Sequence, residues 1–330
     1  MITPITGENI AYFEHLIPDD LIEDLLIRRD NFGIGCLRRD LEGNLDGFGV
    51  LIFAIECDEK EVVENYHIRW MYVDSKMRDE GIGCELLTDL YWEFGNTEVP
   101  TMTIDIPAME EYVDLGTFMS DWHFQFGPTY TLDFEIPLSD LKKNDFFSGI
   151  TKDTVIKGVV PLKDVDENSL KVFLREMRKK YVKRSMYVDM MLTDYKIDYF
   201  DQEISSVILK NGVVEGAMLV HTRPSGRIEV VVFDTLQDNK QMYLAQLMNK
   251  SYQAALASKI KNATVYHKCY NERGMDFIDK LFGTHKTPYV LRGIIQNSSI
   301  GISSEQWEEI KAEYWHEHPD LYQEMQSIRM

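Results

Sequence analysis

The stretch VDSKMRDEGIGCELL, residues 73–87, decides the fold. A run of strand type, YHIRWMYV (66–73), leads into it, and an amphipathic helical pattern leads out of it. Gly81 and Gly83 stand where this helix begins. Glycine has no side chain to keep a ligand from the backbone, and it tolerates positive φ. Backbone amides at the start of a helix lack intrahelical acceptors and lie at the positive end of its dipole, so the junction suits a phosphate group.

The length of 330 residues favours two domains, and a hydrophobic content of 44% is ample for packed cores. The net charge of −20 is uneven: residues 1–145 hold 10 Lys and Arg against 31 Asp and Glu, and the remainder holds 25 against 24. An acidic first part repels nucleic acid and anionic membranes and favours cationic ligands. The alternative interpretation is that the charge serves solubility alone.

The four cysteines are scattered without the spacing of a metal or redox motif, at Cys36, Cys57, Cys84 and Cys269. This pattern predicts reduced thiols in a cytoplasmic protein, with no disulfide framework and no metal site. The first residues show no signal peptide. The longest apolar runs, such as VLIFAI, are of strand length, so no membrane association is expected.

The first half is expected to mix helices and strands. Helical spacing covers residues 18–29, and strands are expected at 34–38, 48–56, 65–73 and 101–106. The last of these alternates, which places Asp105 on its polar face. A shorter helix is expected over 110–121 and a further strand over 129–136. The helix after the glycines carries its apolar face at Ile82, Leu86, Leu87, Leu90 and Phe94.

The segment 138–153 is the expected boundary, giving domains 1–145 and 146–330. Beyond it the order of elements recurs, which predicts a degenerate internal repeat of one fold. The expected elements are a strand at 154–160, a helix at 166–181, a hairpin at 205–222, a strand at 226–235, a helix at 240–259, a strand at 263–268, a helix at 272–282 and a helical tail from residue 303. The basic segment REMRKKYVKR (175–184) is either a solvated face or a surface that docks on the acidic first domain.

The pattern V-x-x-x-x-R-x-x-G-x-G, met by Val73, Arg78, Gly81 and Gly83, resembles the acetyl-CoA motif of GNAT-type N-acetyltransferases. The order of flanking elements extends this resemblance over the first domain, and the second domain looks like the same fold without the motif. The resemblance implies an α+β (mixed α/β) fold of two tandem GNAT-like domains, each a mixed, mostly antiparallel sheet flanked by helices. It implies that acetyl-CoA binds the first domain alone, at Met71, Tyr72, Val73, Arg78, Asp79, Glu80, Gly81, Ile82, Gly83 and Cys84.

Within this set, the strand backbone at 71–73 is expected to hold the acyl arm, and Arg78 with the loop amides is expected to hold the pyrophosphate. Asp79 and Glu80 depart from the family pattern, which has small or basic residues there. Carboxylates beside a pyrophosphate weaken binding unless their side chains point to solvent.

The resemblance also implies where the catalytic base lies, because family members often carry it on the strand before the motif. His67 and Arg69 occupy those positions, and period two places both on one face with Met71. The positive charge of Arg69 is expected to favour the neutral form of the His67 imidazole. Arg69 itself is expected to lie beside the substrate. Glu64 is the alternative base, and a histidine simply hydrogen-bonded within a sheet is the alternative to any catalytic role.

The acid is less well defined, because Met119 stands where the family often has tyrosine. Tyr112, His123 or water could replace that tyrosine as the proton donor, and Tyr112 is the candidate general acid. Asp105 is expected at an acidic mouth for a cationic amine, or else it is only solvated. The preferred function is an N-acetyltransferase acting on a small-molecule or peptide amine by direct attack in a ternary complex. The alternative is a non-catalytic acyl-CoA-binding module or regulator.

Overall fold

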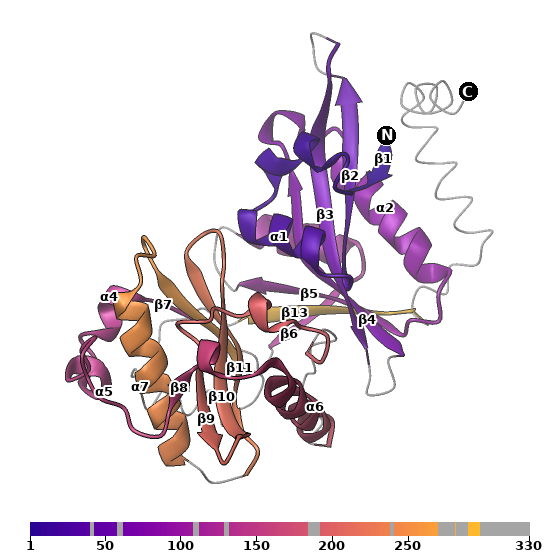
Figure 1. The fold of residues 1–330 in the computed structure, drawn as a ribbon. Helices are drawn as coiled ribbons and strands as arrows, with labels where there is room; N and C mark the ends of the chain where they lie inside the picture. The colour runs from indigo at the N-terminus through magenta and orange to yellow at the C-terminus, as the bar shows by residue number, and fades with distance from the viewer. Residues whose placement is uncertain are drawn as a thin grey trace.

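The computed structural model describes residues 1–39, 43–57, 62–107, 112–128, 132–183, 192–237, 241–269, 281 and 290–297 (Figure 1). They form a seven-stranded sheet in the order β1-β2-β3-β4-β5-β13-β6 and a six-stranded sheet in the order β7-β12-β11-β10-β9-β8. Strand pairs are antiparallel except β4–β5 and β11–β12. The predicted fold class, two mixed and mostly antiparallel sheets flanked by helices, is confirmed.

The first sheet carries α1 on one face and α2 and α3 on the other. All five residues of the predicted apolar face of α2 are at most 1% exposed, which confirms that the helical period aims them at the sheet. The strands are β1 Ile2–Pro4, β2 Asn31–Arg39, β3 Leu45–Cys57, β4 Val63–Val73, β5 Thr101–Pro107, β6 Gln125–Pro128 and β13 Val290–Gln296, and the helices are α1 Asp19–Ile27, α2 Ile82–Gly95 and α3 Val113–Asp121.

The second sheet repeats this arrangement, with α6 on one face and α7 on the other. The predicted hairpin at 205–222 is confirmed as β9 and β10, whereas the strand expected at 154–160 is reduced to the short β8. Its elements are β7 Leu132–Pro137, α4 Leu138–Leu141, α5 Asp145–Ser148, β8 Val160–Pro161, α6 Glu167–Lys183, β9 Ser206–Lys210, β10 Val213–Thr222, β11 Arg227–Thr235, α7 Gln241–Ala257 and β12 Thr264–Cys269.

The two halves exchange a strand. β7, from the first half of the chain, pairs with β12 in the second sheet, and β13, from the end of the described chain, pairs with β5 and β6 in the first sheet (Figure 1). The expected boundary between residues 145 and 146 therefore does not coincide with the division between the sheets. The segment 129–136 reads as a strand in the sequence, but a local pattern does not say which sheet a strand joins.

Three further expectations concern other parts of the chain. The helix expected at 272–282 and the tail from residue 303 fall almost wholly outside the described residues, and α3 is described only from Val113. Among the described residues, no helix combines the length and the apolar character needed to cross a membrane.

Candidate active site

The most open part of the first sheet lies between β4 and β5. These parallel strands pair from Asn65 with Thr101 to Ile68 with Ile104, and no further. β4 continues to Val73 while paired only with β3. Residues 69–73 therefore present one backbone edge that has no strand partner in the described part of the chain. Donors and acceptors along such an edge are available to a ligand.

A β-bulge in β4 marks the point where the two strands part. On β3, Phe53 pairs with Ile68 and the preceding Ile52 pairs with Trp70, so Arg69 is an extra residue in β4. A bulge bends and twists its strand, and the inserted residue reverses the alternation of faces beyond it.

The bulge overturns one expectation about side-chain direction. Ile68 and Met71 both pack into the core on the α2 side, whereas Trp70 packs into the core on the α1 side. The prediction that His67, Arg69 and Met71 share a face is therefore wrong, because period two does not survive an inserted residue.

A shallow hollow lies on the α1 side of the sheet, over Trp70 and Tyr72 of β4. Its volume is about 280 Å³, and the Trp70 and Tyr72 rings that help to line it stack with centroids 6.2 Å apart. Trp70 Nε1 donates to the Leu16 carbonyl oxygen at 2.9 Å, which fixes the ring against the chain before α1. The complete lining is His15, Leu16, Ile17, Pro18, Trp70 and Tyr72.

The loop after β4 delivers the start of α2 to the end of the open edge. Gly81 is the N-cap residue, with φ 77° and ψ 0°, a left-handed conformation that suits glycine. No side chain caps this helix. The amides of Ile82, Gly83 and Cys84 therefore have neither an intrahelical acceptor nor a side-chain cap, which is the geometry of a helix-terminal anion site.

The charged side chains of the loop are exposed. Asp79 and Glu80 both face solvent, the condition under which their carboxylates are compatible with a bound phosphate. The guanidinium of Arg78 lies 5.7 Å from the centroid of the Tyr72 ring, and its Nε is 3.4 Å from the Val73 carbonyl oxygen. Arg78 thus lies between the open strand and the helix start.

The remaining loop residues also have structural roles. A Cβ on Gly83 would lie 3.3 Å from the Phe118 ring and 3.4 Å from Met71 Cε, so this glycine lets α3 approach α2 as well as leaving the backbone bare. The Ile82 side chain is buried in the core. Burial, together with the charge of Glu85, raises the pKa of the Cys84 thiol.

A row of hydrogen-bonded polar side chains crosses the α1 side of the sheet. Asn65 Nδ2 donates to Glu56 Oε2 at 2.7 Å and to Thr103 Oγ1 at 2.7 Å, and Thr103 Oγ1 lies 2.9 Å from His67 Nδ1. Because an amide nitrogen only donates, Thr103 Oγ1 accepts from Asn65, and its hydroxyl proton is free to donate to Nδ1. In the tautomer that accepts this proton, the ring proton of neutral His67 is on Nε2, which faces Asp105 Oδ2 at 3.9 Å.

His67 is held in its neutral form. Burial, followed by the charge of Lys268, lowers its pKa to about 3, while Asp105 opposes the shift. Arg69 contributes the smallest of the lowering effects, so the neutral state is as expected although its main cause is different. With its Nδ1 lone pair engaged and so low a pKa, His67 is a weak proton acceptor.

Asp105 does not form an acidic mouth. Arg292 binds it through two hydrogen bonds, of 2.7 and 2.8 Å, and Lys268 Nζ lies 3.6 Å away. Burial alone would raise the pKa of Asp105, but the Arg292 hydrogen bond and the charges of Lys268 and Arg292 hold it below its ordinary value. The expectation is corrected because β13 places Arg292 directly opposite Asp105 in the sheet.

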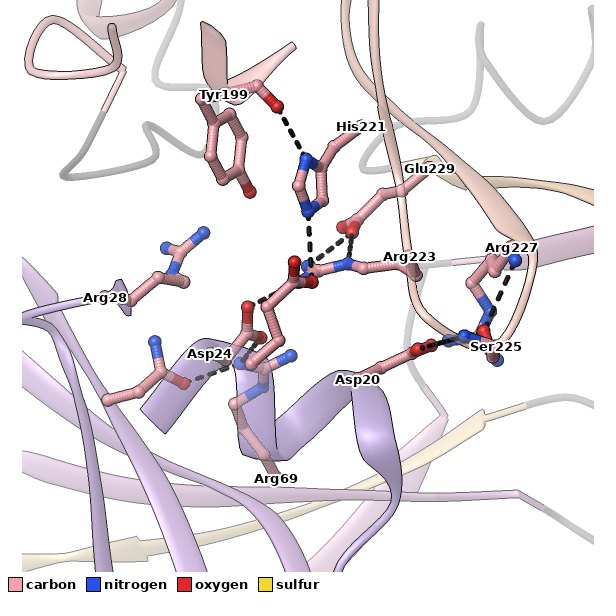
Figure 2. Close-up of polar contacts among 12 residues, drawn as sticks. Asp20, Asp24, Arg28, Arg69, Tyr199, His221, Arg223, Ser225, Arg227 and Glu229 are labelled. Carbon is pink, nitrogen blue, oxygen red and sulfur yellow. Dashed lines mark hydrogen bonds and ion pairs between the residues drawn. The ribbon is translucent and has the colours of Figure 1, made fainter. Parts of the chain in front are cut away.

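Arg69 is engaged at the contact between the halves. Its Nη1 donates to Asp24 Oδ2 and to Asn31 Oδ1, and Asp24 also binds Arg223 from the second half (Figure 2). These contacts assign Arg69 a structural role, and its expected place beside a substrate stays a prediction.

The acidic first half and the nearly neutral second half do meet, but through residues outside the basic segment 175–184. Three α1 carboxylates, at Asp20, Glu23 and Asp24, contact His221, Arg223, Ser225 and Arg227 (Figure 2). From the basic segment, α6 Lys180 instead bonds Asp234 and the Thr235 carbonyl of its own half. The charge pattern of a single helix cannot reveal these partners, because they come from turns that are distant in the sequence.

The candidate acid lies away from His67. Tyr112 directly precedes α3 and packs against the core on the α2 side of the sheet, opposite the polar row. Met119 is fully buried in the same core. Among the described residues, no three His, Cys, Asp or Glu side chains gather in a way that could hold a metal ion.

None of the protein-family models or curated proteins compared with the chain matches it. The comparison of structures finds a tandem GNAT protein from the clavulanic acid biosynthesis pathway, with a TM-score of 0.61 at 12% identity, over 90% of this chain and 98% of that one. The chain has the tandem GNAT fold. A GCN5-related N-acetyltransferase from Sphaerobacter thermophilus gives a TM-score of 0.55 at 10% identity, over 90% of this chain and 95% of that one.

A third tandem-length match is the glucosamine N-acetyltransferase region of a fungal multi-domain β-N-acetylglucosaminidase. Its TM-score is 0.56 at 12% identity, over 89% of this chain and 38% of that one. At such low identity the similarity establishes the GNAT fold of the chain, and its chemistry has to be argued from its own residues.

Proposed function

We propose that this GNAT-fold chain is an N-acyltransferase that transfers an acyl group, acetyl in the first instance, from coenzyme A to an amine. The observation that carries the proposal is the continuity of the first-half opening. The unpaired edge of β4 ends at Val73, and the loop that follows leads to the uncapped start of α2. A thioester with an extended amide-bearing arm and a diphosphate matches that sequence of strand edge and helix terminus.

The donor would be held mainly by the backbone. The backbone groups of Met71 and Val73 on the open edge suit the acyl arm, whereas those of Tyr72 face Val50 of β3. The amides of residues 81–84 suit the diphosphate, with Arg78 beside them. Bound there, the thioester supplies the activated acyl group. The exposed side chains of Asp79 and Glu80 reduce the affinity without blocking the site.

The acceptor would enter on the α1 side, at the shallow hollow over β4. Trp70 and Tyr72 line the hollow, and no carboxylate is among its lining residues. Arg292 and Lys268 neutralise Asp105, which removes the main argument for a cationic amine. The hollow favours an amine that carries an apolar or aromatic group.

Proton transfer would depend little on a strong base in the protein. His67 is neutral and has Nδ1 engaged by Thr103, so its proposed role is to orient the polar row at the reacting centre. The amine proton would then leave to solvent. Holding both reactants in one site supplies much of the rate in such a direct attack.

A second function, an acyl-CoA-binding module without turnover, is favoured by a specific observation. Met119 stands where the family often has its tyrosine, and its thioether side chain, which is fully buried, cannot donate a proton. The weak basicity of His67 points in the same direction.

Calorimetry with acetyl-CoA, followed by a thiol-release assay over a panel of aromatic, aliphatic and cationic amines, tests both functions. We expect binding, and coenzyme release that depends on an added aromatic or aliphatic amine. Binding without release from any amine would support the module. A folded chain that binds no acyl-CoA would contradict both.

A further inference from the structure

The two halves of the molecule share one carboxylate. Asp24, on α1 and 2% exposed, accepts a hydrogen bond on each oxygen. Arg69 Nη1 of the first half donates to Oδ2, and Arg223 Nη1 of the second half donates to Oδ1 at 2.6 Å (Figure 2). The orientation of the Asp24 carboxylate is therefore set from both halves at once, because charge-assisted hydrogen bonds are strongly directional.

Arg223 is itself rigidly held. Its side chain is 4% exposed, and it follows directly after β10 in a turn closed by a hydrogen bond from its amide to the Arg227 carbonyl oxygen at 2.8 Å. Its Nε donates to Glu229 Oε2 at 2.6 Å, and its Nη1 lies 3.1 Å from Glu23 Oε2. A planar guanidinium with several carboxylate partners leaves little freedom for the group it binds.

Arg69 is the residue whose insertion opens the first-half site. It is the bulged residue of β4, and pairing with β5 ends one residue earlier, at Ile68. A bulge can relax or shift along its strand unless its side chain is anchored. Asp24 and Asn31 are the anchors of Arg69, and of these Asp24 is the one bonded directly to a residue of the second half.

We propose that Arg223 is a positioning residue: through Asp24 it holds the Arg69 bulge and so keeps the β4 edge open for acyl-CoA. The second half, which lacks the motif, thereby sets the coenzyme affinity of the first half. The affinity part of this inference rests on the proposed function. The mechanical part, from Arg223 to the backbone of β4, does not.

The test compares two arginines of the same interface in the full-length chain. Arg223→Lys keeps the charge but loses the fork that reaches Asp24 and Glu229 together. Arg227→Lys is the matched control, because Arg227 also reaches an α1 carboxylate, Asp20 at 3.6 Å, but is 37% exposed and makes no bond to Asp24. By calorimetry with acetyl-CoA we expect about fivefold weaker binding for Arg223→Lys and less than about twofold for Arg227→Lys.

Amide hydrogen exchange separates this inference from the proposed function. In the chain without coenzyme, Arg223→Lys is expected to speed exchange at residues 69–73 about tenfold, with β2 and α7 unchanged. If the wild-type chain binds no acetyl-CoA, the proposed function fails, and the exchange at 69–73 still decides the mechanical link. Unchanged exchange there, or equal exchange in both variants, overturns the positioning role.

A general loss of stability is distinguished by its pattern. A merely structural role would lower the melting temperature and raise exchange across the interface, without a selective change in β4 or in coenzyme affinity. If Arg223→Lys does not fold, Glu229→Gln, which loosens Arg223 within its own half, is measured in the same way. Combined with Arg69→Lys, either variant is expected to be clearly non-additive, since both act through Asp24; additive effects contradict the proposal.

Discussion

Each of the two sheets has a bulged strand that continues beyond its parallel neighbour, but the side chains beside these two openings differ. In the first sheet, the bulge at Arg69 is followed by the unpaired edge of β4. In the second sheet, Leu219 pairs with Val232 and Val220 with Val230, so Val231 is the corresponding bulged residue of β11. There the parallel pairing with β12 ends at Glu229, and β11 continues alone on that side among the described residues.

What occupies the openings differs. Four residues after its bulge, β11 reaches Thr235, whose carbonyl oxygen and whose neighbour Asp234 both bind Lys180 of α6. Two residues before each bulge stand His67 in the first half and Glu229 in the second, and Glu229 is committed to Arg223. The fold therefore contains a splayed strand in each sheet. The side chains leave the edge of β4 open, whereas those beside β11 form structural contacts.

The largest effect is expected from a substitution at the start of α2 that would remove the difference between the two openings. Gly81→Val places a β-branched residue at φ 77° and adds a side chain beside the free amides. Losing several charge-assisted hydrogen bonds to the diphosphate is expected to weaken acetyl-CoA binding about 100-fold, measured by calorimetry.

The control for this variant is a glycine with the same φ in the other half. Gly158 also has φ 77°, with open space around its Cβ position. Gly158→Val is expected to cost a similar backbone strain, about 1–2 kcal/mol of unfolding free energy, with coenzyme affinity unchanged. Equal affinities for the two variants would show that the turn at Gly81 does not hold the coenzyme.

A smaller effect is expected from the ion pairs of the exchanged strands. Asp105→Asn leaves half-buried Arg292 and Lys268 without their carboxylate, and we expect a loss of about 2 kcal/mol in unfolding free energy by urea titration. The corresponding pair in the second sheet, Arg227 with Glu135, is exposed at 37% and 39%. Glu135→Gln is therefore expected to cost less than about 0.5 kcal/mol, and the reverse order would contradict this account of the exchange.

The sequence is sufficient for most elements because their signals are local. The apolar face of α2, the alternation of β5 and the glycine at the N-cap are each set by neighbouring residues, and all three are found. The motif between β4 and α2 also predicted the family of folds, since a strand, a loop and a helix in that order constrain the backbone strongly.

The expectations that failed depend on distant residues or on one inserted residue. The bulge at Arg69 carries no sequence signal, yet it reverses the faces of the strand beyond it. The run VLRGIIQ, residues 290–296, has the length and apolar content of a strand, but nothing in it says that it lies against β5 and brings Arg292 to Asp105. The charge of a site is therefore harder to predict than its backbone, because the neutralising partner comes from the other half.

The smallest expected effect is a pH dependence of stability that comes from the lowered pKa of His67. Its folded-state pKa of about 3 lies below the unfolded value near 6.5, so between these values the unfolded chain binds the proton and the folded chain does not. Stability therefore falls as the pH drops through this window, and His67 alone accounts for about 1 kcal/mol between pH 6.5 and pH 5.5.

His67→Gln should remove that share, because its amide oxygen can still accept from Thr103 but does not titrate. Urea unfolding of both proteins at pH 7.5, 6.5 and 5.5 gives the difference, in which the other histidines cancel. Parallel stability curves would mean that His67 is protonated as readily in the folded chain as in water. Its imidazole would then be basic enough to take the amine proton itself, and the first half would owe its chemistry to a general base and not to an open strand edge alone.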